Sequence, residues 1–240
     1  MKKILITGAS GGIGSSIADK FLKNKYEMIL TSSSDINLSK LKQKYGNNHH
    51  YYILNFNNPD ENNIILKKIS EEHQDLNIIV NNAGITDDSL LLRMKTDQWN
   101  NVIQANLSSN FSIIKALLPN MIKNKSGKII GISSVVATSG NPGQSNYVAA
   151  KSGMIGFYKS IALEVASRNV NVNIISPGFI ISPMTDKLND KQKNVILEKI
   201  PMKRFGESNE IADLVYFLSS DKSRYITGQN IHINGGMLMV

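Results

Sequence analysis

Short apolar runs alternate along the chain with longer segments in which apolar residues recur every three or four positions. Runs such as LNIIV and GKIIGI are almost continuously apolar, which is typical of strands whose two faces are both covered. The pattern predicts seven strands, namely Lys3–Thr7, Glu27–Thr31, Tyr51–Leu54, Asn77–Asn81, Lys128–Ser133, Asn171–Ser176 and Asn230–Ile233.

Helical periodicity separates these strands and is clearest in Ile13–Asn24, Pro59–His73, Thr96–Lys123, Tyr147–Ser167 and Ser208–Ser219. Because strands alternate with helices and such crossovers are right-handed, the pattern predicts an α/β fold. We expect a Rossmann-type doubly wound sheet of about seven parallel strands with helices on both faces. The 240 residues fit a single domain, 1–240, better than two small ones, and no internal repeat or convincing linker interrupts them.

Composition narrows the class of protein. The chain has no cysteine, which excludes disulfides and thiolate metal sites and suits a reducing cytosol, and we expect no metal centre. The N-terminal apolar run Ile4–Ile6 is shorter than the roughly 7–15 residues of a secretory signal. No segment reaches the roughly 20 apolar residues of a membrane span. We therefore expect a cytoplasmic protein that does not enter the membrane.

The net charge of +8, from 27 basic and 19 acidic residues, leaves two interpretations open. It can reflect a Lys- and Asn-rich surface with no special partner. It can also serve a polyanionic partner, such as an acidic protein, a phosphorylated ligand or nucleic acid. Nucleic acid is the weakest of these, because no dense basic run and no alternation of aromatic and basic residues occurs.

A glycine-rich turn follows the first predicted strand directly. Gly8, Gly12 and Gly14 in TGASGGIG form G-x-x-x-G-x-G, which differs from the usual G-x-G-x-x-G fingerprint of dinucleotide sites. The physical requirement is similar, because a tight turn must bring backbone N–H groups and a helix N-terminus against a pyrophosphate. The alternative is a glycine-rich turn that binds no ligand.

The segment QSNYVAAKSG contains Tyr147 and Lys151, which would share one face of a helix. In a Lys-rich chain with 8 tyrosines, about one Tyr-x-x-x-Lys match is expected by chance. The pair therefore carries weight only together with other residues.

Those other residues are present, and with them the chain resembles the short-chain dehydrogenase/reductase family. The resemblance begins at Thr-Gly-x-x-x-Gly-Ile-Gly and continues through NNAG at Asn81–Gly84, then Asn106, Ser134, YVAAK and SPG at Ser176–Gly178. Each motif falls after a predicted strand or on an adjoining helix, as a ligand site at the carboxyl ends of the strands requires.

The resemblance assigns a catalytic role to four residues. The Tyr147 hydroxyl would donate a proton to a substrate carbonyl while a nicotinamide delivers hydride to its carbon. Lys151 would lower the phenol pKa from its reference value of about 10 and bind the nicotinamide ribose. Ser134 would orient the carbonyl oxygen, and Asn106 would hold a water that relays protons to Lys151. Each of these side chains could instead have an ordinary structural role.

The region after the second strand favours NADPH over NADH. Dinucleotide folds that prefer NADH carry Asp or Glu there, whereas this chain has Ser32 at the expected site, and Asp35 comes late. Hydroxyls of Thr31 to Ser34 would have to hold the 2′-phosphate, because Gly11 stands where NADPH-dependent relatives often carry Arg or Lys. The cofactor-binding residues implied by the resemblance are Gly8, Ser10, Gly11, Gly12, Ile13, Gly14, Thr31, Ser33, Asn55, Phe56, Asn82, Ala83, Gly84, Tyr147, Lys151, Pro177, Gly178, Ile180 and Ser182.

Within the family, NNAGITDDSLLLRMK, GNPGQSNYVAAKSG and YITGQNIHINGGMLMV look most like bacterial 3-oxoacyl-[acyl-carrier-protein] reductases. The implied reaction is NADPH-dependent reduction of a 3-oxoacyl thioester to the (3R)-3-hydroxyacyl form in fatty-acid elongation. The implied partner is the acidic acyl carrier protein, which would dock on Lys125 and Arg168. Lys125 stands where Arg is common, and Lys lacks the bidentate fork of Arg.

The resemblance also implies a homotetramer and a substrate lid at residues 183–203. Around the start of this lid, the sequence ISPMTDKL departs from the usual family sequence, and Pro183 would stiffen the hinge. Two other functions stay open. One is a reductase of the same family that acts on acetoacetyl-CoA or another small ketone. The other is a non-catalytic nucleotide-binding protein, which the intact set of Asn106, Ser134, Tyr147 and Lys151 disfavours.

Overall fold

The computed structural model describes residues 1–181 and 189–240. Seven strands form one sheet in the order β3-β2-β1-β4-β5-β6-β7, and every neighbouring pair is parallel. This confirms the predicted doubly wound fold. The strands are β1 (Lys3–Ile6), β2 (Glu27–Ser32), β3 (His50–Ile53), β4 (Leu76–Asn81), β5 (Gly127–Ile132), β6 (Val170–Pro177) and β7 (Asn230–Ile233).

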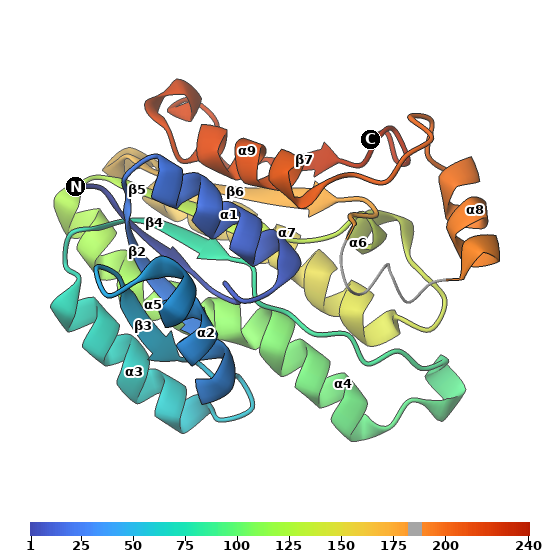
Figure 1. The fold of residues 1–240 in the computed structure, drawn as a ribbon, viewed down its shortest axis with the longest axis horizontal. Coiled ribbons are helices and arrows are strands. Elements are labelled where there is room, and N and C mark those ends of the chain that lie inside the picture. The colour runs from blue at the N-terminus through green and yellow to red at the C-terminus, as the bar shows by residue number, and fades with distance from the viewer. Residues whose placement is uncertain (182–188) are drawn as a thin grey trace.

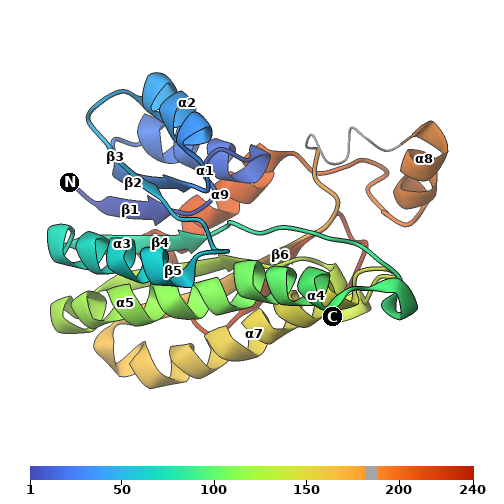
Figure 2. The same cartoon turned by 90° about the horizontal axis from the view of Figure 1, so that it is seen from below.

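Helices cover both faces of the sheet, as Figures 1 and 2 show. On one face lie α1 (Gly12–Lys23), α2 (Asp35–Tyr45) and α9 (Ser208–Leu218), and on the other lie α3 (Pro59–Glu72), α5 (Ser109–Asn124) and α7 (Ser145–Val165). The other α-helices in the described part of the chain are α4 (Thr96–Ile103), which leads into α5, the short α6 (Val136–Ser139), and α8 (Asp190–Glu198). Among the described residues, no helix is long and apolar enough to cross a membrane.

The two faces of the sheet bury separate cores because strand side chains alternate in direction. In β1, Ile4 and Ile6 pack with α1 and α9, whereas Leu5 between them packs with α3, α5 and α7. All three side chains have 0% exposure. Burial on both faces explains why the strand sequences are nearly continuous in apolar residues.

The strand predictions are correct to within one residue at each end. The helix predictions are less complete. The predicted single helix Thr96–Lys123 consists of α4, a π-helical stretch at Gln104–Ser108, and α5. The helix α2 was not predicted from the sequence, since only Leu41 and Tyr45 of its residues are buried.

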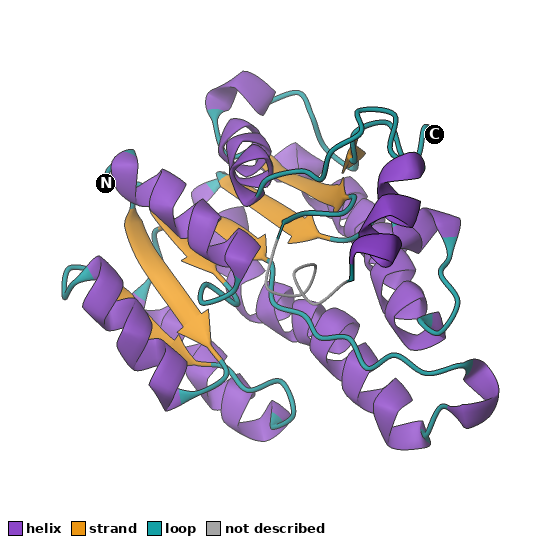
Figure 3. Cartoon of the chain, turned by 45° about the vertical axis from the view of Figure 1, so that its right-hand side comes forward, coloured by secondary structure: helices purple, strands orange, loops and turns teal. Residues whose placement is uncertain are grey.

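The carboxyl ends of the strands face the same end of the molecule, which holds α6 and α8 (Figures 1 and 3). Four segments lie at this end: the glycine turn after β1, the segments after β4 and β5, and the SPG segment at the end of β6. The fold thus brings together motifs that are far apart in the sequence.

Candidate active site

The glycine turn after β1 is fixed to the segment that follows β4. The Thr7 hydroxyl accepts hydrogen bonds from the backbone N–H groups of Asn82 and Ala83, each at 3.0 Å. In return, the Asn82 side-chain amide donates to the carbonyls of Thr7 at 3.0 Å and Gly8 at 3.2 Å. These reciprocal bonds join two of the predicted motifs into one rigid surface.

Glycine is required at the first position of this turn. Gly8 has φ +64°, and a Cβ there would lie 2.9 Å from Cα of Ala83. The turn leads into α1, whose N-cap Gly11 offers no side-chain oxygen, so the first N–H groups of α1 have no acceptor within the helix. Gly11 and Gly12 are exposed. A helix N-terminus of this kind fits the pyrophosphate of a dinucleotide.

The end of β2 carries hydroxyls and no carboxylate. Thr31 and Ser32 are buried, and Ser34 caps α2 by accepting a hydrogen bond from the N–H of Asn37 at 3.4 Å. Ser33 is exposed, and Ser10 of the glycine turn lies near, with its hydroxyl oxygen 3.5 Å from that of Ser32. Of the hydroxyls expected to meet a 2′-phosphate, Ser33 is therefore the one that faces solvent without a structural role.

After β3, the residues predicted to flank the cofactor have structural roles as well. The Asn55 carbonyl accepts a hydrogen bond from the Asn62 side chain at 2.7 Å, and its own side chain accepts one from the N–H of Asn57 at 3.2 Å. Phe56 packs against the core on the α3 side. This loop is thereby held at the same end of the sheet as the glycine turn.

Lys151 is buried beside Tyr147 in the first turns of α7. Its Nζ lies 5.6 Å from the centroid of the Tyr147 ring and donates a hydrogen bond to the carbonyl of Ile132 at 2.7 Å. The side chain is only 3% exposed, and burial lowers the pKa of its ammonium group to about 8. The predicted pair is therefore a real spatial pair.

The pKa of Tyr147 is raised to about 12, mainly by burial, with a hydrogen bond to Ser134 acting in the opposite direction and the carboxylate of Asp88 adding to the rise. Lys151 is not among the causes of this shift, so the lowering expected from its charge stays a prediction. A phenol in this state is a proton donor that stays protonated throughout the neutral range.

Ser134 and its neighbour Ser133 have different environments. Ser133 is buried, and its hydroxyl donates to the carbonyl of Lys151 at 3.1 Å. Ser134 is partly exposed and interacts with Tyr147, while its oxygen accepts a hydrogen bond from the N–H of Val136 at 3.4 Å. The partial exposure of Ser134 fits its predicted contact with the substrate carbonyl, whereas Ser133 is buried and bonded to the backbone.

Asn106 lies in the π-helical stretch between α4 and α5 and has 0% exposure. Its side-chain amide bonds both backbone groups of Ile85, accepting from the N–H at 3.0 Å and donating to the carbonyl at 2.8 Å. It also donates to the carbonyl of Val102 at 2.9 Å. Asn106 thus fixes the segment after β4, and π-helical stretches are frequent at functional sites.

Comparison with known proteins agrees with this geometry. A family profile described as Enoyl-(Acyl carrier protein) reductase matches residues 8–238. The chain is 47% identical to the 3-oxoacyl-[acyl-carrier-protein] reductases FabG of Salmonella typhimurium (strain LT2) and Escherichia coli (strain K12), over 100% of this chain and 98% of each relative. It is 44% identical to the protein of that name from Staphylococcus epidermidis, over 99% of both chains.

The chain belongs to the short-chain dehydrogenase/reductase family. It is therefore an oxidoreductase of a family that uses a nicotinamide cofactor. The chemistry of this family fits the cluster at the carboxyl ends of the strands, which consists of the glycine turn, Ser134, Tyr147 and Lys151.

The two predicted docking cations of this reductase lie at the opposite end of the sheet from Tyr147. Lys125 precedes β5 and Arg168 precedes β6, so both lie at the amino ends of these strands. They are neighbours, because the Asn169 side chain donates to the carbonyl of Lys125 at 3.2 Å. The 21 residues of α7 separate Arg168 from the first turn that carries Tyr147, a distance of about 30 Å.

Part of the predicted cofactor and lid region falls outside the described residues, namely Ser182 and the segment 183–188, which includes Pro183. Pro177, Gly178 and Ile180 are described. The carbonyl of Pro177 accepts a hydrogen bond from the N–H of Val135 at 2.8 Å, which joins the SPG segment to the residue after Ser134. In the remaining part of the predicted lid, α8 carries no buried residue.

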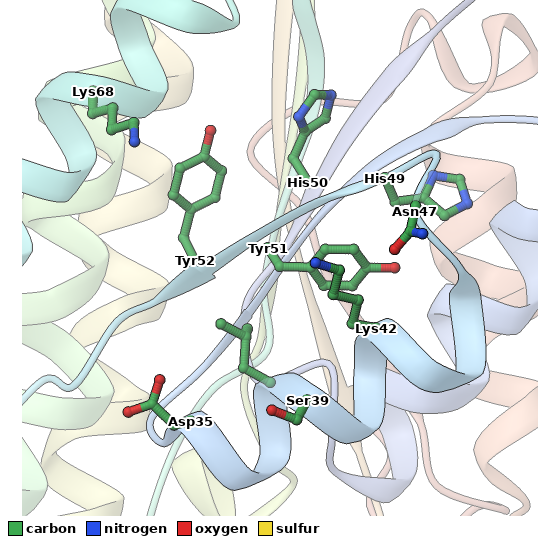
Figure 4. Close-up of a pocket in the computed structure, with 10 residues that line it drawn as sticks. Asp35, Ser39, Lys42, Asn47, His49, His50, Tyr51, Tyr52 and Lys68 are labelled. Atoms are coloured by element: carbon green, nitrogen blue, oxygen red, sulfur yellow. The ribbon is translucent and has the colours of Figure 1, made fainter.

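A surface hollow of about 560 Å³ lies at the β3 edge of the sheet, apart from the predicted site residues. In Figure 4, Lys42 approaches it from α2 and Lys68 from α3, while Tyr51 and Tyr52 come from β3. Of the residues predicted for catalysis or cofactor binding, none that the structure describes lines this hollow.

Proposed function

We propose that the protein is an NADPH-dependent 3-oxoacyl-[acyl-carrier-protein] reductase, which forms (3R)-3-hydroxyacyl thioesters in fatty-acid elongation. The observation that carries this proposal is the convergence of Ser134, Tyr147 and buried Lys151 near Gly84, whose segment is hydrogen-bonded to the glycine turn. The full-length similarity to proteins named as such reductases supports the substrate class.

In this reaction, the bound dihydronicotinamide supplies a hydride to the carbonyl carbon at C3. Tyr147 donates its phenolic proton to the carbonyl oxygen, which Ser134 orients by a hydrogen bond. Lys151 then stabilises the developing phenolate by its charge, since at neutral pH a group with a pKa of about 8 is mostly protonated. Asn106, which fixes the segment after β4, would position the water that returns a proton to this pair.

NADPH is the proposed cofactor because residues 31–34 carry only hydroxyl groups. A carboxylate there would repel the 2′-phosphate of NADPH and accept hydrogen bonds from the 2′-hydroxyl of NADH. The exposed Ser33 hydroxyl, with Ser10 close by, would bind the 2′-phosphate.

A cytoplasmic homotetramer that accepts the acidic acyl carrier protein completes the proposal. Lys125 and Arg168 would dock the carrier protein, but about 30 Å separates Arg168 from Tyr147 along α7. We therefore infer that these cations serve the active site of a neighbouring subunit. The excess of 27 basic over 19 acidic residues favours an acidic partner.

A substrate panel tests the proposed function. The protein would be mixed with NADPH or NADH and, in separate reactions, acetoacetyl-carrier protein, acetoacetyl-CoA and a 2-enoyl-carrier protein, while absorbance of the reduced nicotinamide is followed. We expect rapid oxidation of NADPH with the acetoacetyl thioesters, most efficiently with the carrier-linked one. Turnover of the enoyl thioester alone would instead match the description of the family profile. Equal rates with NADH would overturn the cofactor assignment.

A further inference from the structure

The residue before the proposed proton donor, Asn146, is one of the most completely buried polar residues of the chain, with 0% exposure. It occupies the second position of α7, and Tyr147 the third. The backbone N–H groups at the start of a helix have no partner within it. The N-cap Gln144 supplies no side-chain hydrogen bond here. Instead, Oδ1 of Asn146 accepts the N–H of Tyr147 at 2.8 Å.

The amide nitrogen of Asn146 connects Tyr147 to a distant part of the chain. Nδ2 donates to the carbonyl of Asp87 at 3.0 Å and to that of Gln98 at 3.1 Å. Asp87 belongs to the segment after β4, and Gln98 to α4. The Gln98 side chain also bonds the Asp87 carboxylate at 2.5 Å, so both acceptors are themselves held together.

Further bonds join the same two segments around Asn146. The N–H of Ser89 donates to the carbonyl of Gly143 at 2.8 Å, and the Gln144 side chain donates to the Asp88 carboxylate at 2.9 Å. Asn106 fixes the beginning of this segment through Ile85. The segment 85–98 is therefore anchored at one end by Asn106 and at the other by Asn146.

We propose that Asn146 is a positioning residue of the active site, which locks the first turn of α7 against segment 85–98 and so fixes the Tyr147 hydroxyl beside Ser134. The inference rests on the proposed function, because it concerns the proton donor of that reaction. Catalytic groups must be held within about 0.5 Å of the productive geometry, and a misplacement of about 1 Å can reduce the rate about 100-fold. A buried amide with all three of its hydrogen bonds formed is suited to this role, since Asn146→Ala would remove one hydrogen bond from each of two backbone carbonyls and from the Tyr147 N–H.

The test compares Asn146→Ala with Asn171→Ala, which loses a similar set of bonds far from the site. Asn171 is 9% exposed, and its amide donates to two carbonyls, those of Arg224 at 3.2 Å and Ile226 at 3.1 Å. It lies at the amino end of β6, away from the catalytic residues. Both variants should lose thermal stability. Only Asn146→Ala should lower kcat with acetoacetyl-carrier protein, by about 100-fold with little change in KM, and Asn171→Ala should keep kcat within about two-fold.

A third variant, Asn146→Asp, keeps the oxygen that accepts the Tyr147 N–H but turns a second oxygen towards the two carbonyls. We expect it to lose kcat nearly as strongly as Asn146→Ala. Amide hydrogen exchange of Tyr147 in the ligand-free protein gives a readout without substrate, and it should become faster in Asn146→Ala but not in Asn171→Ala. Equal kcat in the two alanine variants, at equal folded fraction, would overturn the positioning role. Failure of the wild-type protein to reduce any 3-oxoacyl thioester would instead overturn the proposed function.

Discussion

At the scale of single residues, burial has opposite consequences for the two central groups of the site. It lowers the pKa of Lys151 to about 8 and raises that of Tyr147 to about 12. Both shifts favour the neutral form, because a charge loses hydration when it is buried. Near neutral pH the phenol is fully protonated and Lys151 is mostly charged, which is the state that a proton donor and its stabilising cation require.

Lys151 should therefore destabilise the folded, cofactor-free protein below pH 8. The unfolded chain, with a lysine pKa near 10.5, binds more protons than the folded chain between pH 8 and 10.5, so stability rises with pH in that window. Relative to Lys151→Met, the wild-type free energy of unfolding should increase by about 2 kcal/mol between pH 7 and 9.5. Urea denaturation at several pH values measures this difference. A constant difference would mean that Lys151 keeps an ordinary pKa in the folded state.

The sequence was sufficient to predict Ser134, Tyr147 and Lys151, because family motifs carry the resemblance at these positions. It did not reveal Thr7 or Asn146. Their partners are backbone groups of segments that are distant in sequence, such as those of Asn82 and Asp87. A buried Asn next to a motif tyrosine is a weak signal without knowledge of the loop that packs against it.

At the scale of elements, the site depends on how the glycine turn and the segment after β4 fit together. A Cβ at Gly8 would lie 2.9 Å from Cα of Ala83 and 3.2 Å from its N, and φ at Gly8 is +64°. Thr7 and Asn82 close the same contact by hydrogen bonds. The turn can therefore move only together with the β4 segment.

Gly8→Ala should weaken NADPH binding strongly and destabilise the fold, since it combines an unfavourable φ with a backbone clash. Gly46→Ala provides the matched control, because Gly46 has φ +79° at the end of α2 and a Cβ there would meet nothing within 4 Å. It should lose only the cost of its backbone conformation, about 1–3 kcal/mol for a residue other than glycine at ψ −172°, and keep its affinity for NADPH. Fluorescence titration with NADPH and thermal denaturation measure both effects. Equal affinity in the two variants would show that the turn is not part of the cofactor site.

Strands and helices with a regular apolar pattern were predictable, whereas a helix with few buried residues was not. The strand sequences are continuously apolar because helices cover both faces, so their limits can be found to within one residue. By contrast, α2 buries only Leu41 and Tyr45, which leaves little periodicity to detect. The π-helical stretch Gln104–Ser108 escaped prediction because one inserted residue barely changes the helical pattern of its neighbours.

At the scale of the whole molecule, the proposed catalytic and carrier-docking residues occupy opposite ends of the sheet in one chain. The parallel orientation of the strands was predicted from strand–helix alternation. In such a sheet, residues that precede β5 and residues that follow it lie at opposite ends. The sequence alone did not show that Lys125 and Arg168 lie far from Tyr147 of the same chain, because this distance depends on the direction and length of α7.

Charge reversal tests the docking proposal. The double variant Lys125→Glu/Arg168→Glu should raise KM for acetoacetyl-carrier protein about tenfold by repelling the acidic partner, and leave KM for acetoacetyl-CoA nearly unchanged. Lys40→Glu/Lys42→Glu carries the same charge change on exposed positions of α2 and should affect neither. If KM rose equally for both thioesters, or equally in both double variants, the two cations would not form a docking site.

Tyr147 is the proposed proton donor in the reduction of a 3-oxoacyl thioester, and Tyr147→Phe removes only its hydroxyl. The measurement is kcat with acetoacetyl-carrier protein and NADPH, together with the Kd for NADPH, beside the control Tyr225→Phe at a fully exposed tyrosine. We predict that Tyr147→Phe lowers kcat by about 10²–10⁴-fold and leaves NADPH binding largely intact, while Tyr225→Phe behaves as wild type. Retention of wild-type kcat by Tyr147→Phe would show that another group donates the proton.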